Sequence, residues 1–384
     1  MKKVLLLGAT GSIGISTLDV LRLHQDRFRL VGIAANSRWQ EVYQIGKEFS
    51  VNYIAMNDLQ AAQRLQKEAP EWQIFTGEDS ASQLIDEVEC DLIVNALPGT
   101  AGLLPTIHAL EHRCPIALAN KETLVAAGEI VMEWAHRCHI PILPIDSEHS
   151  AIMQCLGNSP QQEIQQLVIT ASGGPFRQWK SEEIFAAGRE QALAHPTWNM
   201  GSKITVDSAS MANKGLEVIE AHWLFDMPYE KINVLVHPES IVHSMVHFVD
   251  GAFLAQLSSP DMRLPIQFAL SYPERWPSPT NQTSFPEIHR LHFYEPDMQR
   301  FPNLKLAYEA GKSGKFATAI YNAADEVAVA AFLQGRIRFG HISLCIEKAL
   351  NELNFQLPFT LENILYVNRQ TQKKVESYID KFIE

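Results

Sequence analysis

The first 150 residues alternate short β-rich segments with helical segments, and this alternation constrains the fold more than any other feature of the chain. Apolar side chains recur at helical spacing over residues 39–49, between two of the β-rich segments. Strands joined by crossover helices run parallel, so we predict a doubly wound α/β domain over residues 1–149. The expected strands are Val4–Leu7, Leu30–Ala34, Tyr53–Met56, Ile74–Phe75, Leu92–Ala96, Ile116–Ala119 and Ile140–Ile145.

The pattern changes near residue 150. Residues 241–248 alternate apolar and polar side chains, and one helical pattern runs from Ser210 to Phe225. Such alternation is typical of a half-exposed antiparallel sheet. We therefore expect a central α+β catalytic domain over residues 150–272.

Proline and then helical patterns dominate the rest of the chain. Six of the 20 prolines fall within residues 273–302, where no periodicity is sustained, and this composition predicts a linker. Beyond it we expect a C-terminal helical bundle over residues 303–384. Its predicted helices are Leu304–Gly311, Ala317–Leu333, Ile342–Leu353 and Gln370–Phe382.

The composition excludes several classes of protein. The formal net charge of −12 disfavours broad binding to nucleic acid or to an anionic membrane. We find no apolar run near the roughly 18 residues that a membrane span needs, and the apolar stretch before Gly8 is too short for a signal peptide. The five cysteines are odd in number and contain no Cys-x-x-Cys pair, which indicates reduced thiols. We expect a cytoplasmic protein without nucleic-acid or membrane partners.

A glycine-rich turn, Gly8-Ala9-Thr10-Gly11-Ser12-Ile13-Gly14, directly follows the first predicted strand and opens a helix. Glycines there permit a tight turn and let the backbone amides of the helix N-terminus approach a pyrophosphate. The spacing Gly-x-x-Gly-x-x-Gly is often seen with NADP. A purely structural turn is the alternative. The position of Gly8–Gly14 between the first strand and the first helix of an alternating domain favours a Rossmann-like dinucleotide site.

The residues after the second predicted strand favour NADP(H) over NAD(H). An acidic residue at this point would bind the ribose 2′-hydroxyl of NAD. The chain instead has Asn36-Ser37-Arg38, without an acid. Arg38 could also be a solvated loop charge.

Three more segments should end at the same edge of the sheet, where ligands of such sheets bind. The small residues of Asn95–Gly102 suit a backbone that passes close to the cofactor. Asn120-Lys121-Glu122 would place an amine and a carboxylate near the nicotinamide, or would merely begin a helix capped by Asn120. In an extended segment the carboxylates of Asp146 and Glu148 would face the same side and could bind one hard cation, although a solvated loop is the alternative.

The central domain offers a third carboxylate and a phosphate site. Asn213 and Glu217 share a helix face one turn apart. Lys214, Ser208 and the turn at 170–176 supply an ammonium, hydroxyls and backbone amides, which suit a phosphate group. The alternative is that Ser208 is a helix cap and Lys214 a surface charge.

The segment His195–Gly201 has no regular period, contains Trp198 and ends in glycine. This composition is typical of a lid that covers a reacting centre and excludes water. A buried tryptophan that anchors a static loop is the alternative.

Taken in order, these motifs resemble the 1-deoxy-D-xylulose 5-phosphate reductoisomerase family of the methylerythritol phosphate route to isoprenoids. The resemblance runs almost end to end. The matching blocks are Gly8–Gly14, Ala119–Glu122, Asp146–His149, Ser172–Phe176, His195–Trp198, Val206–Ser208, Asn213–Glu217, His237–Pro238, His243–Val246, Pro260–Arg263 and Asn322–Ala324.

The resemblance implies a role for each matching position. The implied metal ligands are Asp146, Glu148 and Glu217. The implied substrate contacts are Lys121, Ser147, Glu148, Ser172, His195, Trp198, Ser208, Asn213, Lys214 and Glu217, with Trp198 on a flap over about residues 193–203. The cofactor contacts are Thr10, Gly11, Ser12, Ile13, Asn36, Ser37, Arg38, Gly99, Asn120, Glu122 and Gly201. The chain departs from the family at 36–38, where many members have Gly-x-Asn.

The motifs and the family resemblance together predict an NADPH-dependent isomerisation and reduction of 1-deoxy-D-xylulose 5-phosphate to 2-C-methyl-D-erythritol 4-phosphate. A divalent cation (Mg²⁺, Mn²⁺ or Co²⁺) would assist, and Lys121, Glu148 and His195 would be the catalytic residues. Family members are homodimers, so we expect a homodimeric, cytoplasmic, bacterial enzyme. Two alternatives stay open: a semialdehyde or homoserine dehydrogenase, for which Cys155 would be the nearest candidate nucleophile, and a non-catalytic NADP(H) sensor.

Overall fold

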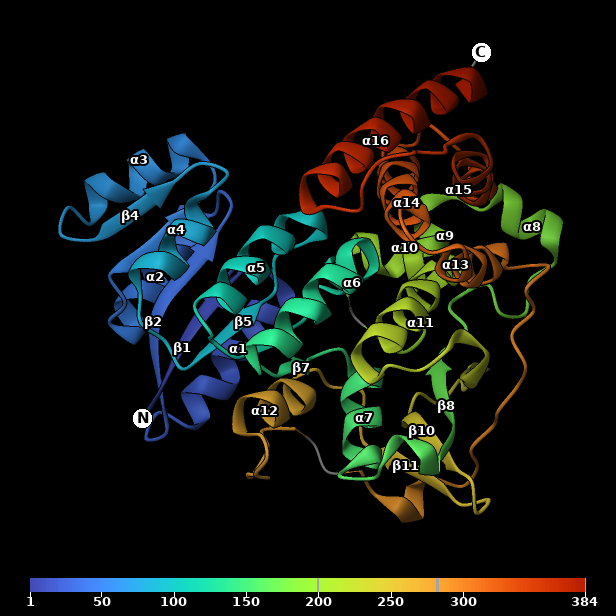
Figure 1. Cartoon of the computed structure of the whole chain (residues 1–384), viewed down its shortest axis with the longest axis horizontal. Coiled ribbons are helices and arrows are strands. Elements are labelled where there is room, and N and C mark those ends of the chain that lie inside the picture. Colours follow the sequence, from blue (N-terminus) through green and yellow to red (C-terminus); the bar gives the residue numbers. More distant parts are fainter. Residues whose placement is uncertain (199, 281–282, 384) are drawn as a thin grey trace. The chain divides into compact units, whose positions relative to one another are not determined.

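The computed structural model describes residues 1–198, 200–280 and 283–383 (Figure 1). Two compact units account for the chain. The first comprises residues 1–123, 131–150 and 261–281, and the second comprises 124–130, 151–260 and 282–384. In the part of the chain that the structure describes, no helix combines the length and the apolar composition needed to cross a membrane.

The first unit is built on a seven-stranded parallel sheet with the order β4-β3-β2-β1-β5-β6-β7. Its strands are β1 (Lys2–Leu7), β2 (Phe28–Ala35), β3 (Tyr53–Met56), β4 (Gln73–Thr76), β5 (Leu92–Asn95), β6 (Ile116–Leu118) and β7 (Ile142–Pro144). The apolar residues of β1 are buried because helices cover both faces of such a sheet. All seven predicted strands and the Rossmann-like fold are confirmed.

Crossover helices connect these strands. They are α1 (Ser12–Leu23), α2 (Trp39–Phe49), α3 (Leu59–Glu68), α4 (Ser80–Glu87), α5 (Leu103–Glu111) and α6 (Lys121–Cys138), and α12 (Arg263–Ser271) joins them from later in the chain. The strand order reverses between β1 and β5, so the loops that follow these two strands diverge. A crevice for ligands forms at such a switch point, beyond the carboxyl ends of the strands.

The second unit contains a four-stranded sheet with the order β11-β10-β8-β9. Its strands are β8 (Ile164–Ala171), β9 (Ile232–Val236), β10 (Val242–Phe248) and β11 (Phe253–Leu257). The antiparallel pairing expected from residues 241–248 is confirmed for β10, which pairs antiparallel with both β8 and β11, whereas β9 runs parallel to β8. The reason is the long connection between these two strands, which contains helices and therefore works as a crossover.

Helices α7 (Ser147–Leu156), α8 (Ser181–Ala186), α9 (Arg189–Leu193), α10 (Ser202–Ser210) and α11 (Ala212–Phe225) lie between β7 and β9 in the chain. The single helix expected from Ser210 to Phe225 is instead preceded by α10. The two helices are separated at Met211, whose backbone is left-handed with a φ of 61°. Residues 194–198 and 200–201 lie outside helices and strands before α10, and Asn199 of the predicted flap lies outside the described residues.

Four helices form the C-terminal bundle: α13 (Pro302–Ser313), α14 (Ala317–Leu333), α15 (Gly340–Glu352) and α16 (Leu361–Ile383). Helix α14 is largely buried and packs against the other three, as the orange and red ribbons of Figure 1 show. Helix α16 begins at Leu361 rather than at the predicted Gln370, because Thr360 caps it by accepting a hydrogen bond from the Asn363 amide at 3.3 Å. In the proline-rich segment before the bundle, residues 281 and 282 lie outside the described residues.

Candidate active site

The turn between β1 and α1 has the geometry of a nucleotide-binding loop. Gly8 has a φ of 87°, and a Cβ added there would lie 2.4 Å from the Ala96 carbonyl oxygen. A Cβ at Gly14 would lie 2.3 Å from the Gly8 oxygen. Only glycine fits at these two positions, and α1 begins after Gly11 without a side-chain cap, so its first amides can face an anion.

Arg38 lies beside this turn, just after β2. Its guanidinium donates a hydrogen bond to the Thr10 carbonyl oxygen at 3.0 Å and lies 3.5 Å from Glu41. The Asn36 side chain accepts a hydrogen bond from Asn57 at 3.2 Å. The basic side chain is therefore held against the predicted pyrophosphate loop, where a 2′-phosphate on the ribose would need it.

A network of asparagines shapes the loops after β5 and β6. Asn120 caps α6 by accepting from the Thr123 amide, and it donates to the carbonyl oxygens of Leu97 at 2.6 Å and Gly99 at 2.7 Å. Asn95 donates to the Gly102 carbonyl oxygen at 2.9 Å. The predicted cofactor residues Gly99 and Asn120 thus belong to one loop assembly, in which Asn120 holds the backbone that would face the cofactor.

Lys121 and Asp146 form a buried ion pair at the carboxyl edge of the same sheet. Burial by itself would raise the pKa of Asp146, but the charges of Lys121 and His149 and a hydrogen bond with Glu148 hold this pKa well below its usual range. The carboxylates of Asp146 and Glu148 offer oxygens close enough to bind the same ion. Two carboxyl groups in contact repel when both are ionised, so this pair fits a divalent cation.

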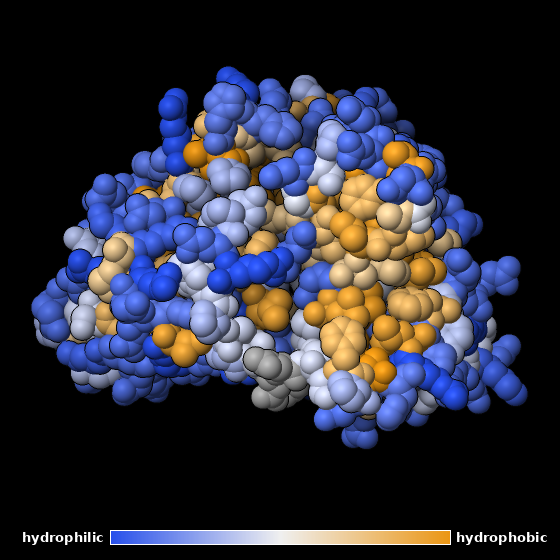
Figure 2. Space-filling view, turned by 90° about the horizontal axis from the view of Figure 1, so that it is seen from below, coloured by the Kyte–Doolittle hydropathy of each residue, from blue (hydrophilic) through white to orange (hydrophobic). Residues whose placement is uncertain are grey.

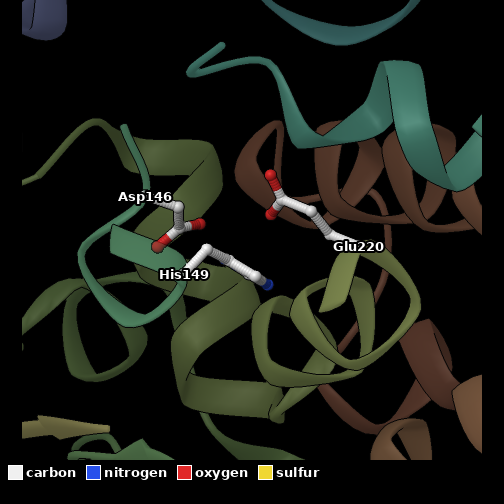
Figure 3. Close-up of side chains that lie close together, drawn as sticks. All are labelled: Asp146, His149 and Glu220. Atoms are coloured by element: carbon white, nitrogen blue, oxygen red, sulfur yellow. The ribbon is translucent and has the colours of Figure 1, made fainter. Parts of the chain in front are cut away.

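The expectation that Asp146 to Glu148 is extended is wrong. The Ser150 amide donates to the Asp146 carbonyl oxygen at 2.9 Å, so Ser147 and Glu148 already belong to the first turn of α7. Ser147 donates a hydrogen bond to the Glu148 carboxylate at 2.5 Å. His149, a fully buried neighbour drawn with Asp146 in Figure 3, has no assigned role in the sequence prediction.

In the second unit, His195 connects two predicted phosphate ligands. Its Nε2 lies 3.0 Å from the Ser172 hydroxyl and 3.2 Å from the Ser208 hydroxyl. Its Nδ1 accepts the backbone N–H groups of Thr197 at 3.2 Å and Trp198 at 2.9 Å. Since Nδ1 accepts, the neutral ring carries its proton on Nε2 and donates it toward the hydroxyls.

Three more predicted residues meet on the first turns of α11. Lys214 lies 2.5 Å from the Glu217 carboxylate, and Asn213 donates to the same carboxylate. Lys214 and Glu217 are both buried, so Lys214 is not a surface charge. Ser208 lies inside α10, so it is not a helix cap either. Glu220, drawn in Figure 3, is a second buried carboxylate one turn further along α11.

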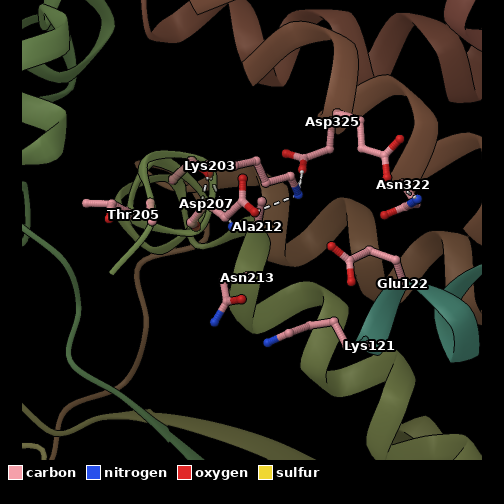
Figure 4. Close-up of polar contacts among 12 residues, drawn as sticks. Lys121, Glu122, Lys203, Thr205, Asp207, Ala212, Asn213, Asn322 and Asp325 are labelled. Atoms are coloured by element: carbon pink, nitrogen blue, oxygen red, sulfur yellow. Dashed lines mark hydrogen bonds and ion pairs between the residues drawn. The ribbon is translucent and has the colours of Figure 1, made fainter. Parts of the chain in front are cut away.

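A charged cluster with two buried carboxylates, which the sequence prediction missed, lies beside this site. Lys203, in the first turn of α10, forms ion pairs with Asp207 and with Asp325 of α14 (Figure 4). The spacing of Lys203 and Asp207 is visible in the sequence, whereas Asp325 lies 122 residues away. Gly201, a predicted cofactor contact, is the residue before α10 and accepts the Thr205 hydroxyl at 2.8 Å.

Lowering the pH should loosen the loop at residues 194–201. Burial lowers the pKa of His195, so the folded state favours the neutral ring. Its contribution to stability is complete above the unfolded pKa of 6.5 and is lost as the pH falls toward the lower folded pKa. Protonated Nδ1 can no longer accept the amides of Thr197 and Trp198. Amide hydrogen exchange at pH 7.5 and 5.5, corrected for intrinsic rates, should reveal faster exchange at low pH.

The variant His195→Asn is the matched control for this prediction. Its amide oxygen can replace Nδ1 as an acceptor but does not titrate in this range. Equal protection of the loop at both pH values in the wild-type protein would contradict the assigned role of His195.

Family models match three consecutive parts of the chain. Residues 4–128 match the 1-deoxy-D-xylulose 5-phosphate reductoisomerase model, residues 142–225 match the C-terminal domain model of that enzyme, and residues 257–374 match the DXP reductoisomerase C-terminal domain model. Together these matches span almost all of the chain.

Individual relatives are similar over the same extent. The 1-deoxy-D-xylulose 5-phosphate reductoisomerase of Bacillus subtilis (strain 168) is 49% identical over 382 residues, which is 99% of this chain and 100% of the relative. The solved enzyme from Zymomonas mobilis in complex with NADPH has a TM-score of 0.92 at 37% identity, covering 98% of this chain and 99% of the other. A DOX-P reductoisomerase solved with NADPH, fosmidomycin and magnesium has a TM-score of 0.94 at 38% identity, covering 99% and 98%.

Proposed function

The chain belongs to the 1-deoxy-D-xylulose 5-phosphate reductoisomerase family, and on that premise we propose how its own residues perform the reaction. It is an NADPH- and divalent-metal-dependent oxidoreductase that isomerises and reduces 1-deoxy-D-xylulose 5-phosphate to 2-C-methyl-D-erythritol 4-phosphate in isoprenoid biosynthesis. A semialdehyde or homoserine dehydrogenase is not favoured. The observation that carries the residue assignments is the edge of the parallel sheet, where the glycine turn, Lys121 and the Asp146–Glu148 pair all follow strand ends.

Asp146, Glu148 and Glu217 are the proposed cation ligands. All three supply carboxylate oxygens, which Mg²⁺ and Mn²⁺ prefer, and each is held by a neighbouring charge or hydrogen bond. When bound, the ion supplies Lewis-acid polarisation of the substrate oxygens. Lys121 balances the charge of Asp146, whose pKa is held well below its usual range, and Lys214 lies 2.5 Å from the Glu217 carboxylate and balances its charge.

The substrate phosphate is assigned to Ser172, His195, Ser208, Asn213 and Lys214. The neutral His195 ring donates from Nε2 toward two hydroxyls, which can in turn donate to phosphate oxygens. Binding at this group, remote from the reacting carbons, provides free energy for orienting the substrate. Trp198 follows His195 on the same loop and would cover the bound substrate and exclude water.

Lys121 and Glu148 are the proposed groups for proton transfer near the reacting oxygens. Lys121 is a buried amine whose charge is balanced by Asp146, and Ser147 orients Glu148 through a 2.5 Å hydrogen bond. Positioned groups of this kind transfer protons to and from substrate oxygens. NADPH would bind the turn at Thr10–Ile13 with Arg38 beside the 2′-phosphate, and would deliver hydride to the rearranged aldehyde.

The first experiment is to follow NADPH absorbance with 1-deoxy-D-xylulose 5-phosphate, with and without Mg²⁺, and to add EDTA midway. Oxidation that requires the metal and stops with the chelator supports the assignment. Tight NADPH binding without oxidation would contradict it.

The variant Cys155→Ser should keep full activity, since the proposed chemistry uses no thiol nucleophile.

We further propose that the enzyme acts as a homodimer through the outer part of the four-stranded sheet. Strand β11 is an edge strand, and Val249, Phe253 and Leu254 are 60%, 54% and 51% exposed. Figure 2, seen from below Figure 1 where β10 and β11 lie, has a broad apolar area coloured orange. An exposed apolar edge strand of this kind needs a partner.

The five cysteines are free thiols, which supports a cytoplasmic location.

The double variant Phe253→Glu/Leu254→Glu should be monomeric. Charges on the edge strand would oppose pairing of two copies. Light scattering after gel filtration should give the chain mass of 43.2 kDa for the variant and twice that mass for the wild type. Leu59→Glu, at an exposed apolar position in the first unit, is the control and should not change the mass. A monomeric wild-type protein would refute the proposal.

A further inference from the structure

Two buried carboxylates in the second unit share one lysine. The side chains of Asp207 and Asp325 are 3% and 0% exposed, and Lys203 Nζ lies 2.6 Å from Asp207 and 2.9 Å from Asp325. The ammonium of Lys203 reaches both carboxylates in Figure 4. Removing the cation from such a group is costly because it leaves buried charges without compensation.

Nearby Tyr321 does not replace Lys203 as a partner for the carboxylates. Its hydroxyl donates to the Asn303 carbonyl oxygen at 3.1 Å. Burial, together with the charges of Asp325 and Asp207, raises the pKa of Tyr321 well above its ordinary value, so the phenol stays neutral. Among the contacts of the described residues, Lys203 thus supplies positive charge to both Asp207 and Asp325.

The position of Lys203 in the chain connects this cluster to the loop. Lys203 lies in the first turn of α10, directly after residues 194–201, and Asp207 lies one turn later. Ser208, which contacts His195 at 3.2 Å, follows Asp207 on the same helix. Asp325 belongs to α14, the buried helix of the C-terminal bundle. One ammonium thus attaches the beginning of α10, and with it the end of the loop, to a largely buried helix.

We propose that Lys203 is a positioning residue: through its ion pairs with Asp207 and Asp325 it fixes α10 against α14, and so sets Ser208 and the flap for the substrate phosphate. This inference rests on the proposed assignment of the phosphate to Ser172, His195 and Ser208. Lys203 itself is assigned no contact with the substrate. Its effect is carried by the position of the helix, because displacing a binding group by about 1 Å is enough to weaken its function strongly.

The test uses Lys203→Met in the full-length protein, with Lys203→Arg as the conservative variant. For Lys203→Met we expect the KM for substrate and the inhibition constant of inorganic phosphate to rise about tenfold, as for loss of a buried charged hydrogen bond. The dissociation constant of NADPH should change much less than these two constants, because Thr10–Ile13 and Arg38 of the proposed cofactor site lie in the first unit and only Gly201 borders α10. Hydrogen exchange in residues 194–201 should become faster, and Lys203→Arg should restore wild-type values.

Two further variants keep the test decisive. Asp325→Asn preserves the shape of the cluster and one ion pair, so it should fold and change the same constants in the same direction by a smaller factor. Arg336→Met is the control: Arg336 also holds two carboxylates, Glu376 at 2.8 Å and Asp380 at 3.3 Å, but these lie on α16. It should leave the phosphate inhibition constant unchanged.

The outcomes separate this inference from the proposed phosphate site. Wild-type phosphate inhibition and loop exchange in Asp325→Asn or in folded Lys203→Met would overturn the inference. An equal change in Arg336→Met would also overturn it, since the effect would then be general destabilisation. Ser208→Ala tests the phosphate site independently: if its inhibition constant does not rise, the proposed site is wrong, whatever Lys203 does.

Discussion

Replacing Glu217 with glutamine is expected to reduce turnover by about 1000-fold or more, because Lewis-acid stabilisation worth several kcal/mol is lost with the ion. Glutamine keeps the size of the side chain but removes the charge. The Lys214 ammonium, which lies 2.5 Å from the Glu217 carboxylate, would then face a neutral amide. The site would carry one more net positive charge. Both effects disfavour a divalent cation.

The experiment should separate metal binding from folding and from cofactor binding. Turnover is measured as NADPH oxidation across a titration of Mg²⁺ or Mn²⁺, and NADPH affinity is measured by fluorescence. We expect the variant to need far more metal and to bind NADPH almost as the wild type does, since the glycine turn lies in the other unit.

Glu220→Gln is the matched comparison for this prediction. Glu220 is also buried and lies one turn beyond Glu217 on α11, so the two variants remove the same charge from the same helix. The proposed assignment predicts the larger loss for Glu217. Normal metal dependence in Glu217→Gln would show that this carboxylate is not a ligand.

The parts of the site that the sequence predicts correctly depend on local geometry. The turn at Gly8–Gly14 follows a strand and begins a helix, and Asn213, Lys214 and Glu217 share a helix face because of helical periodicity. Such relations need only the spacing of residues along the chain. The same reasoning locates the seven strands of the first unit, most of whose buried residues are apolar.

The parts that the sequence does not predict depend on contacts between distant segments or on competition between local structures. Lys203 and Asp325 are 122 residues apart, so no spacing rule connects them. Asp146 to Glu148 was expected to be extended, but a helix begins at Ser147 and turns these residues instead. Asp146 directly before the helix and Glu148 in its first turn form a pattern that is typical of a helix N-terminus. This pattern could have predicted the helix in place of an extended segment.

Replacing Gly11 with alanine should weaken NADPH binding by about 100-fold, the factor that corresponds to about 2.7 kcal/mol, while the protein folds normally. A Cβ at Gly11 would meet only the Gly8 oxygen at 3.4 Å, which is an ordinary contact, and Gly11 has a φ of −81° that alanine adopts easily. The protein itself therefore has room for the methyl group. A pyrophosphate bound to the first amides of α1 would not leave that room.

Gly8→Ala and Gly188→Ala bracket this prediction. A Cβ at Gly8 would lie 2.4 Å from backbone, so Gly8→Ala should lower the melting temperature as well as the affinity for NADPH. At Gly188, in the second unit, a Cβ would meet only the Gln191 side-chain oxygen at 3.7 Å, so both quantities should stay unchanged. NADPH affinity is measured by fluorescence titration and stability by thermal unfolding of the apoprotein. Because Gly11→Ala separates the two quantities, wild-type affinity in this variant would mean that the pyrophosphate does not lie against the turn.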